Sequence, residues 1–129
     1  MADVNRGNRP LSPFMLGQYY RPQIGSVTSI LNRAAGVGLI VGALLCVWWL
    51  LAAASGPEYF GVVDWIVTSY LGDLVMFLSV WALWYHALAG VRHLIWDAGK
   101  CLDLKEAQLL GKIVIGGSVV LTLITAIIV

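Results

Sequence analysis

Charged residues and cysteines are scarce in this chain, and each scarcity excludes a class of protein. Only 12% of the 129 residues are charged, whereas globular domains average about 25%. The two cysteines, Cys46 and Cys101, match neither a disulfide framework nor a metal-binding spacing, so we expect free thiols without a function. With 60% hydrophobic residues and a mean hydropathy of +0.84, the chain has no room for a soluble catalytic domain. A small polytopic membrane protein is favoured.

Three apolar runs are long enough to span a membrane, which requires about 20 residues in a helix. They cover about residues 30–54, 67–96 and 109–129. The segment before them, residues 1–29, is polar and rich in proline and glycine, and we expect it to form an irregular arm. The sequence therefore predicts one all-α membrane-anchor domain with three transmembrane helices.

The basic residues predict how these helices are oriented. All eight Lys and Arg residues lie in the arm, at the start of the first run or around the second connection. The first connection carries Glu58, Asp64 and Asp73 together with aromatic residues typical of the membrane interface. By the positive-inside rule the N-terminus is cytoplasmic and the C-terminus periplasmic. No Ser- and Arg-rich mitochondrial presequence is found, which favours the bacterial inner membrane.

Two histidines and an arginine interrupt the second apolar run. Ionisable side chains at this depth are expensive and usually functional. His86 and His93 are seven residues apart, so they share a helix face at heights about 10 Å apart and cannot both bind one metal ion. If His86 binds a haem iron, the second axial ligand must come from outside this chain. Gly90, one turn from His86, would let a flat macrocycle approach the backbone.

Three potential cations are expected near the cytoplasmic ends of the helices. Arg33 lies about one turn into the first run, and Arg92 and His93 lie about one turn from the same side of the second run. This depth is roughly two turns from His86 and suits donors to the propionate carboxylates of an upright haem. Alternatively, His86 could hydrogen-bond to a neighbouring helix, and the three cations could extend to lipid headgroups.

Other polar and aromatic residues have structural interpretations as well. Ser29 could cap the first helix, and Asp97 could pair with a nearby basic residue. Trp81, Trp84 and Tyr85 have the helical spacing of packing residues. The functional interpretation is favoured because the ionisable residues converge on one face and one depth.

Three motifs resemble a known family. They are RPLSP at residues 9–13, SILNRAAG at residues 29–36 and YHALAGVRHLIWDAG at residues 85–99. The patterns R-P-x-S-P, S-I-x-H-R-x-x-G and H-x-x-x-G-x-R-H-x-x-x-D are those of the cytochrome b membrane-anchor subunits of succinate dehydrogenase, respiratory complex II. The likeness covers nearly the whole chain and is greatest to the alphaproteobacterial and mitochondrial versions.

The resemblance implies roles for individual residues. It makes His86 one axial ligand of a single haem b that is shared with a second membrane-anchor subunit, and it places His93 near a haem propionate. Arg33 would lie between the propionates and ubiquinone. Ser29 would lie at the quinone head group, with Ile30 also in the quinone pocket.

One position departs from the family pattern. Asn32 stands where the family usually has His before the arginine. Because Asn cannot carry a proton near neutral pH, the resemblance gives this position no proton-delivery role. Asn32 and Asp97 are left as secondary quinone or structural positions.

The implied function is electron delivery to ubiquinone by a subunit that is not catalytic alone. An iron-sulfur subunit and a flavoprotein subunit would dock on the arm up to residue 28 and on the loop at residues 97–112. Nucleic acid is not an expected partner. The alternatives are an anchor subunit of fumarate reductase and a haem-free membrane scaffold or transporter subunit.

Overall fold

The computed structural model describes residues 22–129 as four helices, three of them long and apolar enough to cross a membrane. These three are α1 (Ile24–Ser55), α3 (Tyr70–Asp97) and α4 (Leu104–Ile128). They confirm the prediction of an all-α protein with three transmembrane helices. Most of the expected arm, residues 1–21, lies outside the described residues.

Two helices extend beyond the apolar runs seen in the sequence. α1 begins inside the segment expected to be the arm, and α4 begins inside the expected loop at residues 97–112. Hydropathy marks the hydrocarbon core, about 30 Å thick, whereas a helix can continue through the headgroup region. The connection between α3 and α4 is therefore short. It contains Gly99 at φ 71° and Cys101 at φ 56°, and the Trp96 Nε1 donates to the Cys101 carbonyl oxygen at 3.2 Å.

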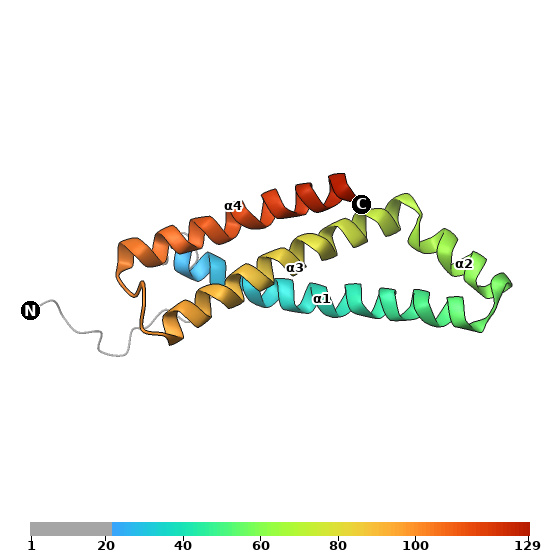
Figure 1. The fold of residues 1–129 in the computed structure, drawn as a ribbon, viewed down its shortest axis with the longest axis horizontal. Coiled ribbons are helices and arrows are strands. Elements are labelled where there is room, and N and C mark those ends of the chain that lie inside the picture. Colours follow the sequence, from blue (N-terminus) through green and yellow to red (C-terminus); the bar gives the residue numbers. More distant parts are fainter. Residues whose placement is uncertain (1–21) are drawn as a thin grey trace, which may run out of the picture.

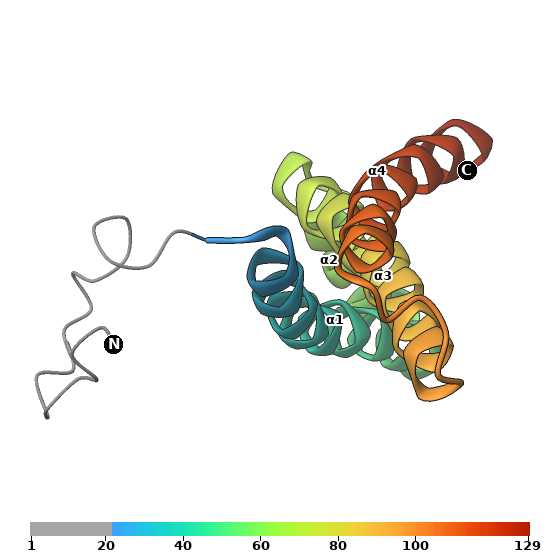
Figure 2. The same ribbon diagram turned by 90° about the vertical axis from the view of Figure 1, so that its left-hand side faces the viewer.

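The transmembrane helices are arranged with α3 between α1 and α4 (Figures 1 and 2). The start of α1, the end of α3 and the start of α4 lie together, and we call this end of the bundle the N-terminal end (Figure 1). The opposite end holds the last turns of α1 and the first turns of α3. All the candidate site residues on α3 lie in its C-terminal half, toward the N-terminal end of the bundle.

A short helix, α2 (Pro57–Val67), was missed by the sequence prediction and joins α1 to α3 (Figure 1). Gly56 at φ 136° ends α1 with a backbone conformation that other residues rarely adopt, and Pro57 then starts α2 with a preset φ. Two indoles of α1 fasten it: Trp48 Nε1 donates to the Tyr59 hydroxyl at 2.8 Å, and Trp49 Nε1 donates to Asp64 Oδ1 at 2.9 Å. α2 is consequently fixed against the far end of α1.

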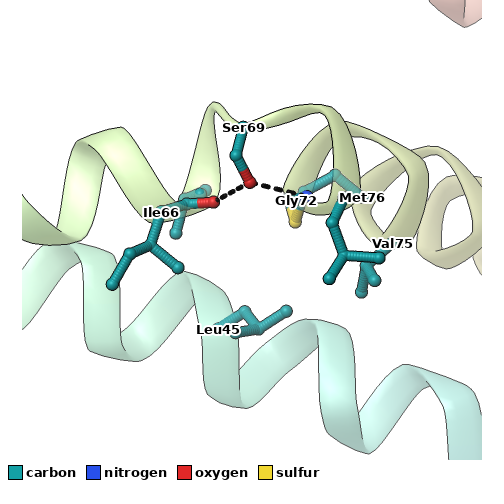
Figure 3. Close-up of a pocket in the computed structure, with 8 residues that line it drawn as sticks. Leu45, Ile66, Ser69, Gly72, Val75 and Met76 are labelled. Atoms are coloured by element: carbon teal, nitrogen blue, oxygen red, sulfur yellow. Dashed lines mark hydrogen bonds between the residues drawn. The ribbon is translucent and has the colours of Figure 1, made fainter.

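The turn from α2 into α3 is shaped by a serine and a glycine (Figure 3). The Ser69 hydroxyl donates to the Ile66 carbonyl oxygen at 2.6 Å and accepts from the Gly72 amide at 3.2 Å, which caps α3. A Cβ at position 72 would collide with the Val67 carbonyl group. Below the turn is a half-open apolar cavity of about 170 Å³ between these residues and Leu45 of α1 (Figure 3).

The interior of the bundle is built from small and hydroxyl-bearing residues. Its buried positions are Thr28, Ala35, Gly42 and Ala52 in α1, Ala82, Tyr85, Ala89 and Arg92 in α3, and Gly111, Val114, Ser118 and Thr122 in α4. Small residues let helix backbones approach closely, which drives helix association where lipid removes the hydrophobic advantage of large side chains. The buried hydroxyls of Ser118 and Thr122 donate to carbonyl oxygens of their own helix.

The three neighbouring aromatic residues of α3 do pack within the bundle. Tyr85 is buried and its ring centroid lies 6.0 Å from that of Trp81. Trp84 Nε1 donates across to Thr125 Oγ1 of α4 at 2.9 Å. The packing interpretation of these residues is confirmed. Cys46 and Cys101 are free thiols, as predicted.

Candidate functional site

His86 is exposed on α3 and is oriented by the main chain of α1. Its Nδ1 lies 3.2 Å from the Asn32 carbonyl oxygen. A carbonyl oxygen can only accept, so in this hydrogen bond Nδ1 carries the hydrogen and Nε2 keeps its lone pair. Such an imidazole has one nitrogen fixed by the protein and one nitrogen available to a metal.

Gly36 makes room for the His86 ring. A Cβ built at Gly36 would lie 3.3 Å from His86 Cε1 and 3.6 Å from Nδ1. The first of these distances is tighter than an ordinary carbon contact. α1 and α3 can therefore approach closely at this level because residue 36 has no side chain.

His93 lies about two helical turns after His86 on the same face, and its ring is also held by a main-chain carbonyl group. It is exposed, and its Nδ1 lies 2.7 Å from the Ala89 carbonyl oxygen of the preceding turn. By the same argument its Nε2 is free to accept a hydrogen bond or, when protonated, to donate one. Its ring also packs edge-on against Trp96, with centroids 5.4 Å apart.

Arg92 points away from this exposed face, into the bundle. It is 3% exposed, and its Nη1 donates to Thr28 Oγ1 of α1 at 2.9 Å. Its guanidinium carbon lies 4.7 Å from the Trp96 ring centroid, within cation–π range. A Cβ added to Gly111 of α4 would lie 3.6 Å from Nη1, so all three transmembrane helices meet around this side chain. This position does not support the predicted contact between Arg92 and a haem propionate.

Thr28 and Tyr85 complete this buried polar group and were not identified from the sequence as site neighbours. Thr28 is fully buried, and its hydroxyl also lies 2.9 Å from the Ile24 carbonyl oxygen, to which it donates. The Tyr85 hydroxyl donates to the Thr28 carbonyl oxygen at 3.1 Å. The one available signal was their place in the chain, directly before Ser29 and His86. The group links the helix that carries Ser29 and Arg33 to the helix that carries both histidines.

The remaining candidate residues of α1 lie mostly outside the bundle. Ser29, Ile30 and Arg33 are exposed, while Asn32 is half-buried and its Oδ1 is a buried atom without a hydrogen-bond partner among the described residues. The interpretation of Ser29 as a helix cap is wrong, because α1 begins at Ile24 with Gln23 as its N-cap. Ser29 lies within the second turn, which leaves its side chain without a capping role.

The backbone of Arg33 lies deeper in the bundle than the sequence indicated. Its neighbour Asn32 contacts His86, so the Arg33 backbone is level with His86 and not with His93. The reason is the early start of α1 at Ile24. Helical side chains point back toward the start of their helix, and the long Arg33 side chain can reach the level of His93 in this way. Asp97, the last residue of α3, is exposed.

The exposed face of α3 is open beside His86. Gly90 lies one turn from His86, and a Cβ at this position would meet nothing within 4 Å. Within residues 22–129, no group of three or more His, Cys, Asp or Glu side chains gathers to hold a metal ion. A metal at His86 would therefore take its other ligands from outside residues 22–129. Three membrane helices with two outward-facing histidines, each held by a main-chain carbonyl group, are typical of a membrane subunit that presents an imidazole to an external group.

Comparison with known proteins identifies the family. The family model described as succinate dehydrogenase/fumarate reductase transmembrane subunit matches residues 5–125, and the chain belongs to this family. It is 49% identical to the succinate dehydrogenase cytochrome b556 subunit of Paracoccus denitrificans over 99% of this chain and 97% of the relative. The cytochrome b556 subunit of Rickettsia conorii is 34% identical over 90% of this chain and 89% of the relative. The cytochrome b560 subunit of Reclinomonas americana is 32% identical, with 94% and 86% covered.

These relatives confirm several predictions made from the sequence. The resemblance to alphaproteobacterial and mitochondrial cytochrome b subunits of succinate dehydrogenase is confirmed. The chain is a multi-pass protein of the bacterial inner membrane and has a membrane-anchor role. The family description includes fumarate reductase as well, whereas the relatives described above are named for succinate dehydrogenase.

Proposed function

We propose that this chain is the haem b-binding membrane-anchor subunit of a succinate:ubiquinone oxidoreductase. The observation that carries the proposal is the orientation of His86, whose Nδ1 contacts the Asn32 carbonyl oxygen and whose Nε2 is left free on an exposed face. Oriented neutral imidazoles of this kind are the usual form of a histidine metal ligand. A bound haem b would supply a one-electron redox centre beside the quinone site.

The haem would be shared with a second membrane-anchor subunit. His93 cannot reach the same iron as His86, because seven residues of helix separate them by about 10 Å. The second axial ligand is therefore a residue of that partner. His93 and Arg33 are the donors for the propionates, because both are exposed and the long Arg33 side chain can extend from the level of His86 toward that of His93.

Ubiquinone would bind at the exposed face of α1 formed by Ser29, Ile30 and Arg33. Ser29 and Arg33 are one helical turn apart, and Ile30 is 65% exposed beside them. Reduction of the quinone adds two electrons and two protons, so negative charge develops on its oxygen. A hydroxyl donor and a guanidinium near that oxygen stabilise this charge. Asn32, which is half-buried, and Asp97 are secondary to this pair.

The soluble partners, an iron-sulfur subunit and a flavoprotein subunit, would dock at the N-terminal end of the bundle. Lys100, Lys105 and Lys112 lie at this end, whereas Glu58, Asp64 and Asp73 lie in or beside α2 at the other end. This distribution supports a cytoplasmic N-terminal end by the positive-inside rule. The docking surface would combine the arm with the connection between α3 and α4.

The test is purification of the assembly through an affinity tag on this chain, followed by two assays on the wild type and on Ser29→Ala. We expect a reduced-minus-oxidised spectrum of a six-coordinate low-spin haem b, and co-purification of the two soluble subunits and a second anchor. Ser29→Ala should lower the rate of ubiquinone reduction about fivefold, the equivalent of one lost hydrogen bond of about 1 kcal/mol. Succinate oxidation by a soluble artificial acceptor should be unchanged, because that assay bypasses the membrane site.

Three results would each contradict a part of the proposal. A purified assembly without haem absorption would leave a scaffold or transporter subunit as the better description. Equal loss of both activities in Ser29→Ala would show an assembly defect and remove Ser29 from the quinone site. Preferential oxidation of a low-potential quinol with fumarate as acceptor would instead assign the chain to a fumarate reductase.

A further inference from the structure

We propose that Gly36 is a positioning residue for the axial ligand, because it opens the Asn32 carbonyl group to the His86 ring. The inference rests on the proposed function, since it concerns how His86 is presented to a haem. Its basis is the contact at 3.2 Å between His86 Nδ1 and the Asn32 oxygen, together with the 3.3 Å distance from a Cβ at Gly36 to His86 Cε1.

Helix geometry explains why a glycine is needed four residues after the acceptor. Each Cα–Cβ bond of an α-helix tilts toward the N-terminus of that helix, so the Cβ of residue 36 would lie over the turn that holds the Asn32 carbonyl group. This oxygen has two lone pairs, and the helix uses one for the Gly36 amide. The second lone pair accepts from His86, and a Cβ at position 36 would crowd the ring in this position because it would lie only 3.3 Å from His86 Cε1.

The hydrogen bond to this carbonyl has a chemical consequence for His86. Donation from Nδ1 fixes the tautomer and the ring orientation and makes Nε2 a more basic ligand. A more basic ligand favours the oxidised iron, so this contact would lower the midpoint potential of the haem. The effect depends on the backbone of residue 32 and not on its side chain. Asn32 can therefore replace the His usual in the family without loss of this contact.

The first experiment compares Gly36→Ala with Gly38→Ala in the purified complex. Both variants add one methyl group to the same helix, but a Cβ at position 38 would meet only the Ala82 Cβ, at an ordinary 3.8 Å. We expect Gly36→Ala to shift the haem midpoint potential to a more positive value and to change the g values of the low-spin electron paramagnetic resonance signal. Gly38→Ala should match the wild type in both measurements. A haem-loaded Gly36→Ala complex with unchanged potential and g values would overturn the inference.

A second experiment leaves Gly36 intact and tests the hydrogen bond on which the inference depends, so it applies even if Gly36→Ala fails to assemble. In His86→Gly, added imidazole can donate from its second nitrogen to the Asn32 carbonyl oxygen, whereas 1-methylimidazole cannot. We expect imidazole to restore the low-spin spectrum at a lower concentration and with a more negative potential than 1-methylimidazole. Equal rescue by the two ligands would overturn the inference.

The proposed function and the role of Gly36 can be contradicted separately. If His86→Leu retains the wild-type haem spectrum, the proposed function is wrong at its centre. A second outcome is a haem spectrum that depends on His86 while Gly36→Ala behaves like Gly38→Ala and imidazole behaves like 1-methylimidazole. In that case only the role of Gly36 is contradicted.

Discussion

Arg92 and His93 are neighbours in the sequence, yet they lie on different faces of α3, one buried and one exposed. Arg92 is 3% exposed, contacts Thr28 and Trp96, and lies beside Gly111 of α4 inside the bundle. His93 is exposed and uses its own helix, through the Ala89 carbonyl oxygen, to hold its ring. The inner face of α3 is formed by Ala82, Tyr85, Ala89 and Arg92, and the open face by His86, Gly90 and His93.

The comparison shows that two polar residues in an apolar helix can have different uses. On the inner face, the guanidinium is stabilised by a hydroxyl and an indole, so it joins helices. On the open face, main-chain carbonyl groups satisfy only one nitrogen of each imidazole, so the other remains for an external group. The inner face therefore serves association of the helices, and the open face would serve the proposed haem binding.

The largest effect is expected from removing the open-face imidazole of His86. His86→Leu should abolish the low-spin haem b absorption, because no other residue of this face can take its place at the iron. The matched control is His93→Leu on the same face, which should retain a low-spin spectrum. Reduced-minus-oxidised spectra of the purified complexes measure both. Equal loss of haem in the two variants would contradict the distinction between ligand and propionate donor.

Truncation on the inner face should affect stability more than the haem. Arg92→Ala removes the hydrogen bond to Thr28, the contact with Trp96 and most of a buried side chain. Truncation of a large buried apolar side chain to Ala costs about 2–5 kcal/mol, and we expect a loss of this order. The thermal midpoint of the solubilised complex should fall, while the remaining folded complex keeps its spectrum and potential. A changed haem potential together with an unchanged thermal midpoint would support the predicted contact of Arg92 with a propionate instead.

The smallest effect is expected from the hydroxyl of Tyr85. Tyr85→Phe keeps the ring and loses one hydrogen bond to the Thr28 carbonyl oxygen, and bonds between membrane helices contribute about 0.6 kcal/mol on average. A small decrease in thermal midpoint is expected. Tyr70→Phe, 90% exposed on the same helix, should show none. A Tyr85→Phe midpoint equal to that of Tyr70→Phe would assign no stabilising role to this bond.

The three spans and the shared face of the histidines could be predicted, because hydropathy and helical spacing are local properties of the sequence. The direction of Arg92 could not. In a soluble helix, the apolar stripe marks the packed face. Here lipid is as apolar as the interior, so the residues of α3 do not show which side meets α1 and α4. The inward position of Arg92 depends on Thr28 and Gly111, which belong to other helices.

Helix α2 and Gly36 were missed for related reasons. α2 is too short to be found by a search for membrane spans, and its place depends on bonds from Trp48 and Trp49. The sequence showed Gly36 only as part of a motif, because its contact with α3 depends on how α1 and α3 pack. Its use depends on a distance to His86, which lies far away in the sequence.

The attachments of α1 at both of its ends have a mechanical consequence. Thr28 is bonded to α3 near one end, and Trp49 is bonded to α2 near the other, about 30 Å along the helix. Hydrogen bonds at these two points restrain α1 from sliding along its axis. A force applied by the proposed quinone or a docked protein would therefore bend the helix between them. The side of this segment that meets α3 carries Gly36, Gly38 and Gly42, which have no side chains to resist bending.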